Sequence, residues 1–230
     1  MRVLPLLLLL LAPLARADEA PGPDLDAIED RALEHEVRGI TADPSVTTSV
    51  ERRVRADPEV YRSLLSDLPL AAKALRAMDM GDYAIEPVEG GCTIDDKAGA
   101  RARCVFGYDE PTRVLVVARG EVEQAPLPEV HGTGVIHVTW TALEAEPGTI
   151  LARCRVDFRL ESRLLHLLTG PFRRALSAVL GEKLTRLVGA AAPLAEAITA
   201  DPWKVLRALE ARGEASREEL ERFKLRYLAH

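Results

Sequence analysis

Aromatic side chains are scarce in this chain of 230 residues: Phe, Trp and Tyr together make up 4% of it. Proteins that hold single-stranded nucleic acid stack its bases on aromatic rings along a basic groove. Here 30 Lys and Arg residues are outnumbered by 36 Asp and Glu residues, and the net charge is -6. Because binding to phosphate backbones needs a basic surface, we expect no nucleic-acid partner.

The signatures of common catalytic and cofactor sites are also missing. The sequence has no GxSxG nucleophile motif, no GxxxxGK(S/T) phosphate loop and no GxGxxG dinucleotide motif. We interpret Gly132-Thr133-Gly134, which is too short for such a loop, as a hairpin turn. The sequence assigns no catalytic residue, metal ligand or cofactor, and it places His137 on the polar surface of a strand. No HExxH motif occurs among the five histidines, which are His35, His131, His137, His166 and His230.

Only three cysteines are present, Cys92, Cys104 and Cys154, and none belongs to a CxxC pair. That absence removes the thioredoxin-like and zinc-knuckle motifs. Cys92 and Cys104 flank a predicted turn, so they are candidates for a disulfide across a hairpin. The alternative is that all three are buried thiols that pack as small apolar side chains, and the sequence leaves both readings open.

Leucine, by contrast, is abundant at the start of the chain, where residues 1–17 read MRVLPLLLLLLAPLARA. Arg2 supplies a positive charge, Leu6 to Ala12 supply an apolar run, and Ala15-Arg16-Ala17 fits a small-x-small cleavage motif. The run is shorter than the roughly 20 residues that span a bilayer, which weighs against the alternative of an uncleaved anchor. We predict a signal peptide over residues 1–17, cut after Ala17. The protein is then periplasmic or secreted and keeps no transmembrane segment.

Residues 18–45 are predicted to form a linker and one short amphipathic helix, whose apolar residues recur at helical spacing: Leu25, Ile28, Ala32 and Leu33. β-Branched residues then predict a strand over 46–55. A helix begins at Asp57-Pro58, because Asp caps helices and Pro suits their first turn. A second short helix is predicted over 70–78, after an interruption at Leu68-Pro69.

Apolar and polar residues alternate from residue 83 to residue 160, between turn signals such as Glu146-Pro147-Gly148. Alternation of this kind is typical of an antiparallel sheet with one buried and one wet face, here of about six strands. Thr169-Gly170-Pro171 then opens a long helix with a wide apolar stripe, and Pro193 is expected to end or kink it. Residues 200–230 are predicted to be a helical tail in two parts, broken at Gly213.

This order of elements, together with two local patterns, resembles the START-like superfamily, also called the SRPBCC or polyketide cyclase group. Ala56-Asp57-Pro58-Glu59-Val60-Tyr61, followed by Leu65-Ser66-Asp67-Leu68, is similar to that family's pattern after its first strand. Leu167-Leu168-Thr169-Gly170-Pro171-Phe172 is similar to the pattern that leads into its last helix.

The resemblance runs from residue 46 to residue 198 and implies an α+β helix-grip domain over 46–199. In that fold a curved antiparallel sheet, here of six to seven strands, surrounds a long C-terminal helix. Two short helices follow the first strand, and residues 200–230 are an addition to it. Members of the superfamily typically bind lipids, sterols, polyketides or other apolar ligands between sheet and helix, and a few are cyclases or hydrolases.

The inward residues of the predicted strands and long helix are the candidate ligand-binding residues, and the alternative is that they fill an ordinary core. We expect an exported protein that binds an apolar or lipid-like small molecule by burying it. Two alternatives stay open: a cyclase or hydrolase that uses Tyr108 or His166, and a protein-interaction module that docks through the tail from Trp203 to Tyr227. The candidates are Phe106, Tyr108, Val116, Val138, Trp140, Cys154, Val156, Phe158, Leu176 and Leu180.

Overall fold

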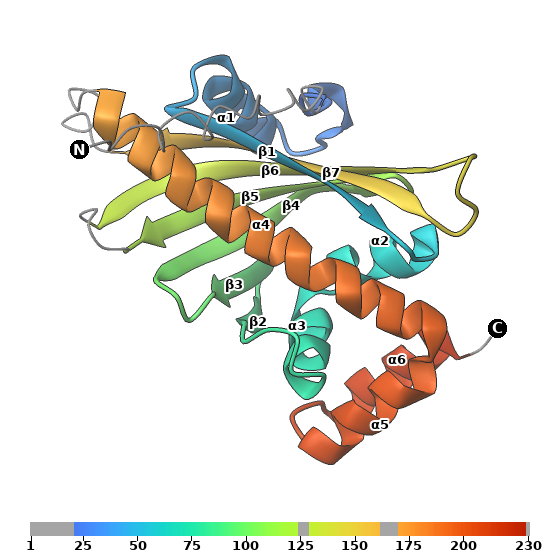
Figure 1. Ribbon diagram of the computed structural model, residues 1–230. Coiled ribbons are helices and arrows are strands. Elements are labelled where there is room, and N and C mark those ends of the chain that lie inside the picture. The colour runs from blue at the N-terminus through green and yellow to red at the C-terminus, as the bar shows by residue number, and fades with distance from the viewer. Residues whose placement is uncertain (1–20, 124–128, 162–169, 229–230) are drawn as a thin grey trace, which may run out of the picture.

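A curved sheet with one long helix across its face dominates the computed structural model, which describes residues 21–123, 129–161 and 170–228 (Figure 1). The predicted signal peptide over residues 1–17 and His166 lie outside the described residues. The inner face of the sheet is the one toward the long helix α4, and the outer face is the opposite one. Within the described ranges, no helix is both long and apolar enough to cross a membrane.

Seven strands form the sheet in the order β1-β7-β6-β5-β4-β3-β2, and every neighbouring pair is antiparallel. This confirms the predicted antiparallel sheet at the upper end of the expected six to seven strands. β1 joins the last strand β7, so the first and last strands of the chain lie together at one side. The strands are β1 Val46–Val54, β2 Ala84–Val88, β3 Gly91–Asp95, β4 Ala100–Glu110, β5 Arg113–Val122, β6 Val130–Ala142 and β7 Ile150–Leu160.

The two short helices after β1 are α2, Pro58–Ser66, and α3, Leu68–Ala77. The Asp57 side chain accepts from the backbone N–H of Glu59 and caps α2, with Pro58 in the first turn as predicted. The second helix begins two residues earlier than its predicted bounds. Leu68-Pro69 does not precede it but forms its first turn, where proline loses no helical hydrogen bond.

The long helix α4 spans Gly170–Ala200 and continues through Pro193. Of the two effects predicted for Pro193, ending or kinking the helix, the first does not occur. Figure 1 shows α4 crossing the inner face of the sheet diagonally. Two helices follow it, α5 (Pro202–Arg212) and α6 (Arg217–Tyr227). They are separated as predicted at Gly213, which takes the left-handed conformation (φ 70°) that glycine adopts without strain.

The segment before β1 contains two elements rather than the single helix predicted. Asp24 caps a short 3-10 helix, η1 (Leu25–Ala27), and Asp30 caps the helix α1 (Arg31–Ala42). The second cap divides the apolar residues between the two elements. Ile28, Leu33, Val37 and Ile40 then pack on the outer face of the sheet, which is therefore covered and not wet along its whole length.

A β-bulge at Gly107 decides which face Tyr108 occupies. Phe106 pairs with Val116, whereas Tyr108 pairs with Leu115, so one extra residue lies in β4 between them. Because side chains alternate along a strand, the extra residue moves Tyr108 to the outer face. Its ring belongs to the cluster beneath α1, and the prediction that Tyr108 lies under α4 is wrong.

His137 is buried, with 4% of its surface exposed, although the sequence placed it on a wet face. Its Nδ1 lies 3.0 Å from the backbone oxygen of Pro21, in the segment that leads into η1. A salt bridge of 2.9 Å between Arg113 and Asp24 holds the same segment on the sheet. The strand pattern correctly assigned His137 to the outer face, but it could not show that another part of the chain covers that face.

The tail is an integral part of the hydrophobic core. Val205, Leu206 and Leu209 of α5 and Phe223 of α6 join the cluster formed by α2, α3, α4 and the inner face of the sheet. Lys73 of α3 donates to both carboxylate oxygens of Glu219 in α6, at 2.7 and 2.8 Å. The tail therefore covers part of the core, and these residues are not free to dock on a partner.

Replacing Phe223 by alanine is expected to destabilise the protein by about 3–5 kcal/mol, because its ring is 1% exposed and its removal leaves a cavity. Leu225→Ala is the matched control on the same helix. Its side chain is 72% exposed, so the change is expected within about 0.5 kcal/mol. Urea unfolding followed by circular dichroism measures both. Equal effects of the two substitutions would show that the tail does not pack as described.

Candidate functional site

A cavity of about 180 Å³ lies between the inner face of the sheet and the first half of α4, and it opens at a rim of charged side chains. Its floor comes from β3 to β7, and Leu180 of α4 closes it from above. The apolar and small lining residues are Tyr83, Ile94, Ala100, Ala102, Cys104, Ala118, Gly120, Val122, Gly132, Gly134, Ile136, Val156, Phe158 and Leu180.

The cavity exists because two neighbouring rows of the sheet carry almost no side-chain volume on their inner face. Ala102, Gly120 and Gly132 are register partners across β4, β5 and β6. The next row consists of Cys104, Ala118 and Gly134. Large side chains at Ala102, Cys104, Ala118 or Gly134 would extend toward α4, whereas the small groups there leave a gap that the close packing of protein interiors normally excludes. At Gly120 and Gly132 a Cβ atom would collide with the backbone oxygen of Arg101 or Arg159, so backbone crowding itself requires glycine at those two positions.

The other half of the inner face is filled. Trp140 of β6 meets Tyr61 of α2 edge to face, with ring centroids 5.6 Å apart, and both rings are almost fully buried. Burial raises the pKa of the Tyr61 hydroxyl well above its usual range. The helix-grip interior therefore has a packed end next to α2 and a hollow end next to the β3–β4 turn.

Three of the ten predicted ligand-binding residues, Val156, Phe158 and Leu180, line the cavity. Tyr108 lies on the opposite face of the sheet. The remaining six pack in the inner core without lining the cavity, which agrees with the alternative of an ordinary core at those positions: Phe106, Val116, Val138, Trp140, Cys154 and Leu176.

The sequence reasoning missed the small residues that create the cavity. Gly132-Thr133-Gly134, interpreted as a hairpin turn, lies inside β6, with both glycines in the cavity floor. A Cβ atom built on Gly134 would lie 3.5 Å from the ring of Phe158, an ordinary contact, so backbone crowding does not require glycine at that position. The sequence did offer one signal of the cavity: small residues occupy the inward-facing positions of three successive strands.

Lys183 of α4 and Asp96 of the β3–β4 turn form an ion pair of 2.8 Å at the rim, with side chains only 11% and 14% exposed. Lys183 also donates to the backbone oxygen of Ala98 at 2.8 Å. Burial acts to raise the pKa of Asp96. The Lys183 ammonium and the backbone N–H groups of Ala100 and Ala98 outweigh it, and the pKa falls below its usual value.

Tyr83 and Arg186 complete the rim on the side of α4. The pKa of Tyr83 is raised by partial burial and by the nearby Asp96, while Arg186 opposes the shift. Across the mouth, Arg101 lies 3.5 Å from Glu121, its register partner on β5. The site thus combines an apolar floor with a ring of charges.

Cys92 and Cys104 are direct register partners on β3 and β4, which confirms that they face each other across a hairpin. Both are buried free thiols, and Cys104 contributes to the cavity floor. A hydrogen bond with Cys92, together with burial, raises the pKa of the Cys104 thiol. Cys154 is isolated from them in the core, where burial raises its pKa to about 12.

Glu121, Glu129 and His131 are the group of described residues whose spacing could suit a metal ion. However, His131 directs Nε2 at Glu129 (3.2 Å) and Nδ1 at Glu121 (3.9 Å). A metal ion takes one nitrogen of an imidazole and brings the other ligands to the same side. A ring between two carboxylates, exposed to solvent, is instead the geometry of a surface ion pair.

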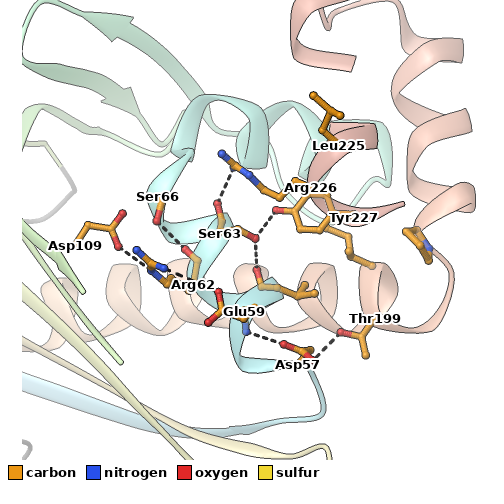
Figure 2. Close-up of a pocket in the computed structure, with 13 residues that line it drawn as sticks. Asp57, Glu59, Arg62, Ser63, Ser66, Asp109, Thr199, Leu225, Arg226 and Tyr227 are labelled. Atoms are coloured by element: carbon orange, nitrogen blue, oxygen red, sulfur yellow. Dashed lines mark hydrogen bonds and ion pairs between the residues drawn. The ribbon is translucent and has the colours of Figure 1, made fainter. Parts of the chain in front are cut away.

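A second, wider hollow of about 930 Å³ separates α2 from the ends of α4 and α6 (Figure 2). Its polar groups are already paired within the chain. The Ser63 hydroxyl donates to the Tyr227 hydroxyl at 2.8 Å, and Arg62 pairs with Asp109 at 3.3 Å. The backbone N–H of Asp57 donates to Thr199 at 3.3 Å. This cleft is a polar junction that joins α2 to β4, α4 and α6.

This chain is similar to known proteins in structure but not in sequence. No protein-family model matches the chain, and no curated protein does. A START superfamily protein from Mycobacterium smegmatis is 15% identical, with a TM-score of 0.47, over 66% of this chain and 99% of its own. Ara h 8.0201 is 9% identical over 64% and 96%, with a TM-score of 0.43. The di-domain ARO/CYC BexL of the BE-7585A biosynthetic pathway is 16% identical over 72% and 55%, with a TM-score of 0.41.

The chain's own topology defines the class of fold. Seven antiparallel strands, two short helices after β1 and a long helix across the inner face make a helix-grip fold of the α+β class, as the sequence predicts. The helical segment before β1 and the helices α5 and α6 are additions to that arrangement.

We expect Asp96→Asn to destabilise the protein by about 1.5–3 kcal/mol at pH 7. Lys183 would then lose its negatively charged hydrogen-bond partner at a place that is largely shielded from water. Asn keeps the oxygen that accepts from the backbone of Ala98 and Ala100. A carboxylate with a lowered pKa stabilises the fold above its unfolded pKa of about 3.9 and loses that effect as the pH falls through the folded value. The difference between wild type and variant should therefore close in acid.

Urea titrations at pH 7 and near pH 3 measure this gap. Glu182→Gln is the control, because Glu182 pairs with Arg186 on the exposed surface of the same helix, where such pairs contribute about 0.3–0.5 kcal/mol. A gap for Asp96→Asn that is equally large at both pH values would contradict the role given to the ion pair.

Proposed function

We propose that this chain is an exported binding protein that holds a small apolar or amphipathic molecule between its sheet and α4. The observation that carries the proposal is the hollow half of the helix-grip interior. Small residues occupy the inner positions of three successive strands there, while the other half of the same interior is filled by Trp140 and Tyr61.

The volume of the cavity limits the size of the ligand. A dry apolar cavity of about 150 Å³ is large enough to hold benzene, so about 180 Å³ accommodates a slightly larger group. Burying each methylene contributes about 0.8 kcal/mol, and six of them contribute about 5 kcal/mol before the loss of translational freedom on association. A buried alkyl chain of six to eight carbons, with its polar end at the rim, fits this cavity.

Binding is favoured over catalysis by where the ionisable side chains lie. Within the described lining residues, the charged groups form the rim, and the floor offers no carboxylate, histidine or lysine. General acid–base chemistry needs such a group within hydrogen-bond reach of the reacting atom. Tyr108, one of the two residues considered for catalysis, faces away from the cavity.

Extracting the protein with solvent and analysing both protein and extract by mass spectrometry tests whether it carries a ligand. In a titration with 1-octanol, Ala118→Leu is expected to weaken binding at least about tenfold, because the larger side chain occupies the floor of the cavity. Ala145→Leu makes the same change in the exposed turn between β6 and β7 and should leave the affinity unchanged. Isothermal calorimetry measures all three proteins.

A protein that is isolated empty and binds neither octanol nor any other octyl compound would overturn the proposal. So would equal affinities of the Ala118→Leu and Ala145→Leu variants, because the cavity between the sheet and α4 would then not be the binding site.

Export rests on the signal-peptide pattern of residues 1–17, and the cysteine pair offers an independent reporter of it. Antiparallel register partners hold their Cα atoms about 4.5–5.5 Å apart, inside the range of about 4.4–6.8 Å that disulfides require. In an oxidising compartment we propose that Cys92 and Cys104 lose their thiol hydrogens by exchange with an oxidised disulfide donor and form a bond between β3 and β4.

Protein recovered from the exported fraction, and shown by mass spectrometry to begin at Asp18, should contain one reactive thiol when it is unfolded without reductant. With reductant it should contain three, since Cys154 has no partner in the core. Cys104→Ser protein provides the control and should expose two thiols under both conditions. Three reactive thiols in the exported protein without reductant would instead support the alternative of three buried thiols.

A further inference from the structure

The charged rim of the cavity selects among the small molecules that the floor could hold. This inference rests on the proposed function, because it concerns the polar end of the same ligand. Five charged side chains line the rim: the cations Arg101, Lys183 and Arg186 and the carboxylates Asp96 and Glu121.

Both carboxylates already have partners that a ligand would have to displace. Asp96 accepts from Lys183 at 2.8 Å. Glu121 lies 3.5 Å from Arg101 and 3.9 Å from Nδ1 of His131. Of the cations in these pairs, Lys183 is nearly buried and also donates to the backbone oxygen of Ala98. Arg101 is more exposed, lies across the mouth and also approaches Asp95 at 3.7 Å.

Arg186 is the exposed rim cation that lies on the same side of the mouth as Tyr83. Its ion-pair partner among the described residues is Glu182, one turn earlier on α4, and both side chains are about half exposed, at 52% and 51%. Exposed pairs of this kind hold weakly, because water competes for both groups. The guanidinium can therefore exchange Glu182 for an anion at the mouth without leaving a buried charge unpaired.

Tyr83 supplies a second donor at the same place. It lines the cavity together with Arg186, and its hydroxyl makes no hydrogen bond to any residue in the described ranges. A phenol donates one hydrogen bond, while a guanidinium presents a planar fork that matches the two oxygens of a carboxylate.

We propose that the ligand is an anionic amphipath, with a short alkyl chain in the cavity and one carboxylate, or an equivalent oxyanion, held at the rim by Arg186 and Tyr83. The apolar floor takes the chain, and the two donors take the head. Because the whole protein carries a net charge of -6, attraction of anions to this rim is a local property of these side chains and not of the overall field.

Isothermal calorimetry with octanoate, 1-octanol and octyltrimethylammonium separates the head from the chain. Octanoate is expected to bind at least about tenfold more tightly than octanol, because a hydrogen bond to a charged group contributes that much to the binding free energy. Octyltrimethylammonium should bind most weakly. Sodium chloride at about 0.5 M should reduce the preference for octanoate and leave octanol unaffected, since salt screens exposed charges. Octyl phosphate in place of octanoate tells which oxyanion the rim prefers.

Arg186→Gln should lower the affinity for octanoate to that for octanol without changing the affinity for octanol, and Tyr83→Phe should have a smaller effect of the same kind. Arg174→Gln is the matched control, because Arg174 is an exposed arginine of the same helix that does not line the cavity. Thermal midpoints equal to that of the wild type show that each variant is folded.

Equal binding of octanoate and octanol by the wild type, or equal effects of Arg186→Gln and Arg174→Gln, would overturn this inference while leaving the proposed function in place. Failure of all three octyl compounds to bind would overturn both. An octanoate preference that disappears in Arg186→Gln, weakens in Tyr83→Phe and persists in Arg174→Gln supports both.

Discussion

The close approach of α4 to β1 is the contact on which the rest of the interior depends. A Cβ atom on Gly181 would lie 3.3 Å from Oγ1 of Thr48, and one on Gly189 would lie 3.3 Å from a guanidinium nitrogen of Arg52. Glycine at both positions lets the helix settle against that strand. The cavity lies beneath α4 against residues of β3 to β7. The side chains on those strands decide how much of that space is filled.

The two halves of α4 are held by different sets of contacts. Its C-terminal half carries Leu194, Ala195 and Ile198 into the core that α2, α5 and α6 complete, and hydrophobic burial fixes it there. In the first half Leu176 is also buried, but there the Lys183–Asp96 ion pair joins the helix to the β3–β4 turn. The packed C-terminal end of α4 provides stability, whereas the other end lies over the cavity and is closed by polar contacts. A ligand can therefore occupy the cavity without loosening the packed end.

Periodicity and capping predicted most of this architecture. The strands, the paired short helices, the long helix and the break at Gly213 each follow from a local pattern that the structure confirms. The cavity was harder to predict, because Gly132 and Gly134 signal a turn as readily as a strand that lacks side chains. Tyr108 was assigned to the wrong face since one extra residue, Gly107, reverses the alternation. Such features depend on cross-strand register, which a single strand's pattern does not contain.

Because α1 covers the outer face of the sheet, the inner face need not supply all of the hydrophobic burial that stabilises the sheet. Leu115, Val117 and Val135 point away from α4 and are buried beneath α1, so β5 and β6 are packed on both sides for part of their length. His137 and the Arg113–Asp24 salt bridge close that layer at its edge. A sheet stabilised from behind in this way does not rely on a filled interior in front. Residues under the first half of α4 are therefore free to be small, and the space that they leave is available to a ligand rather than needed for folding.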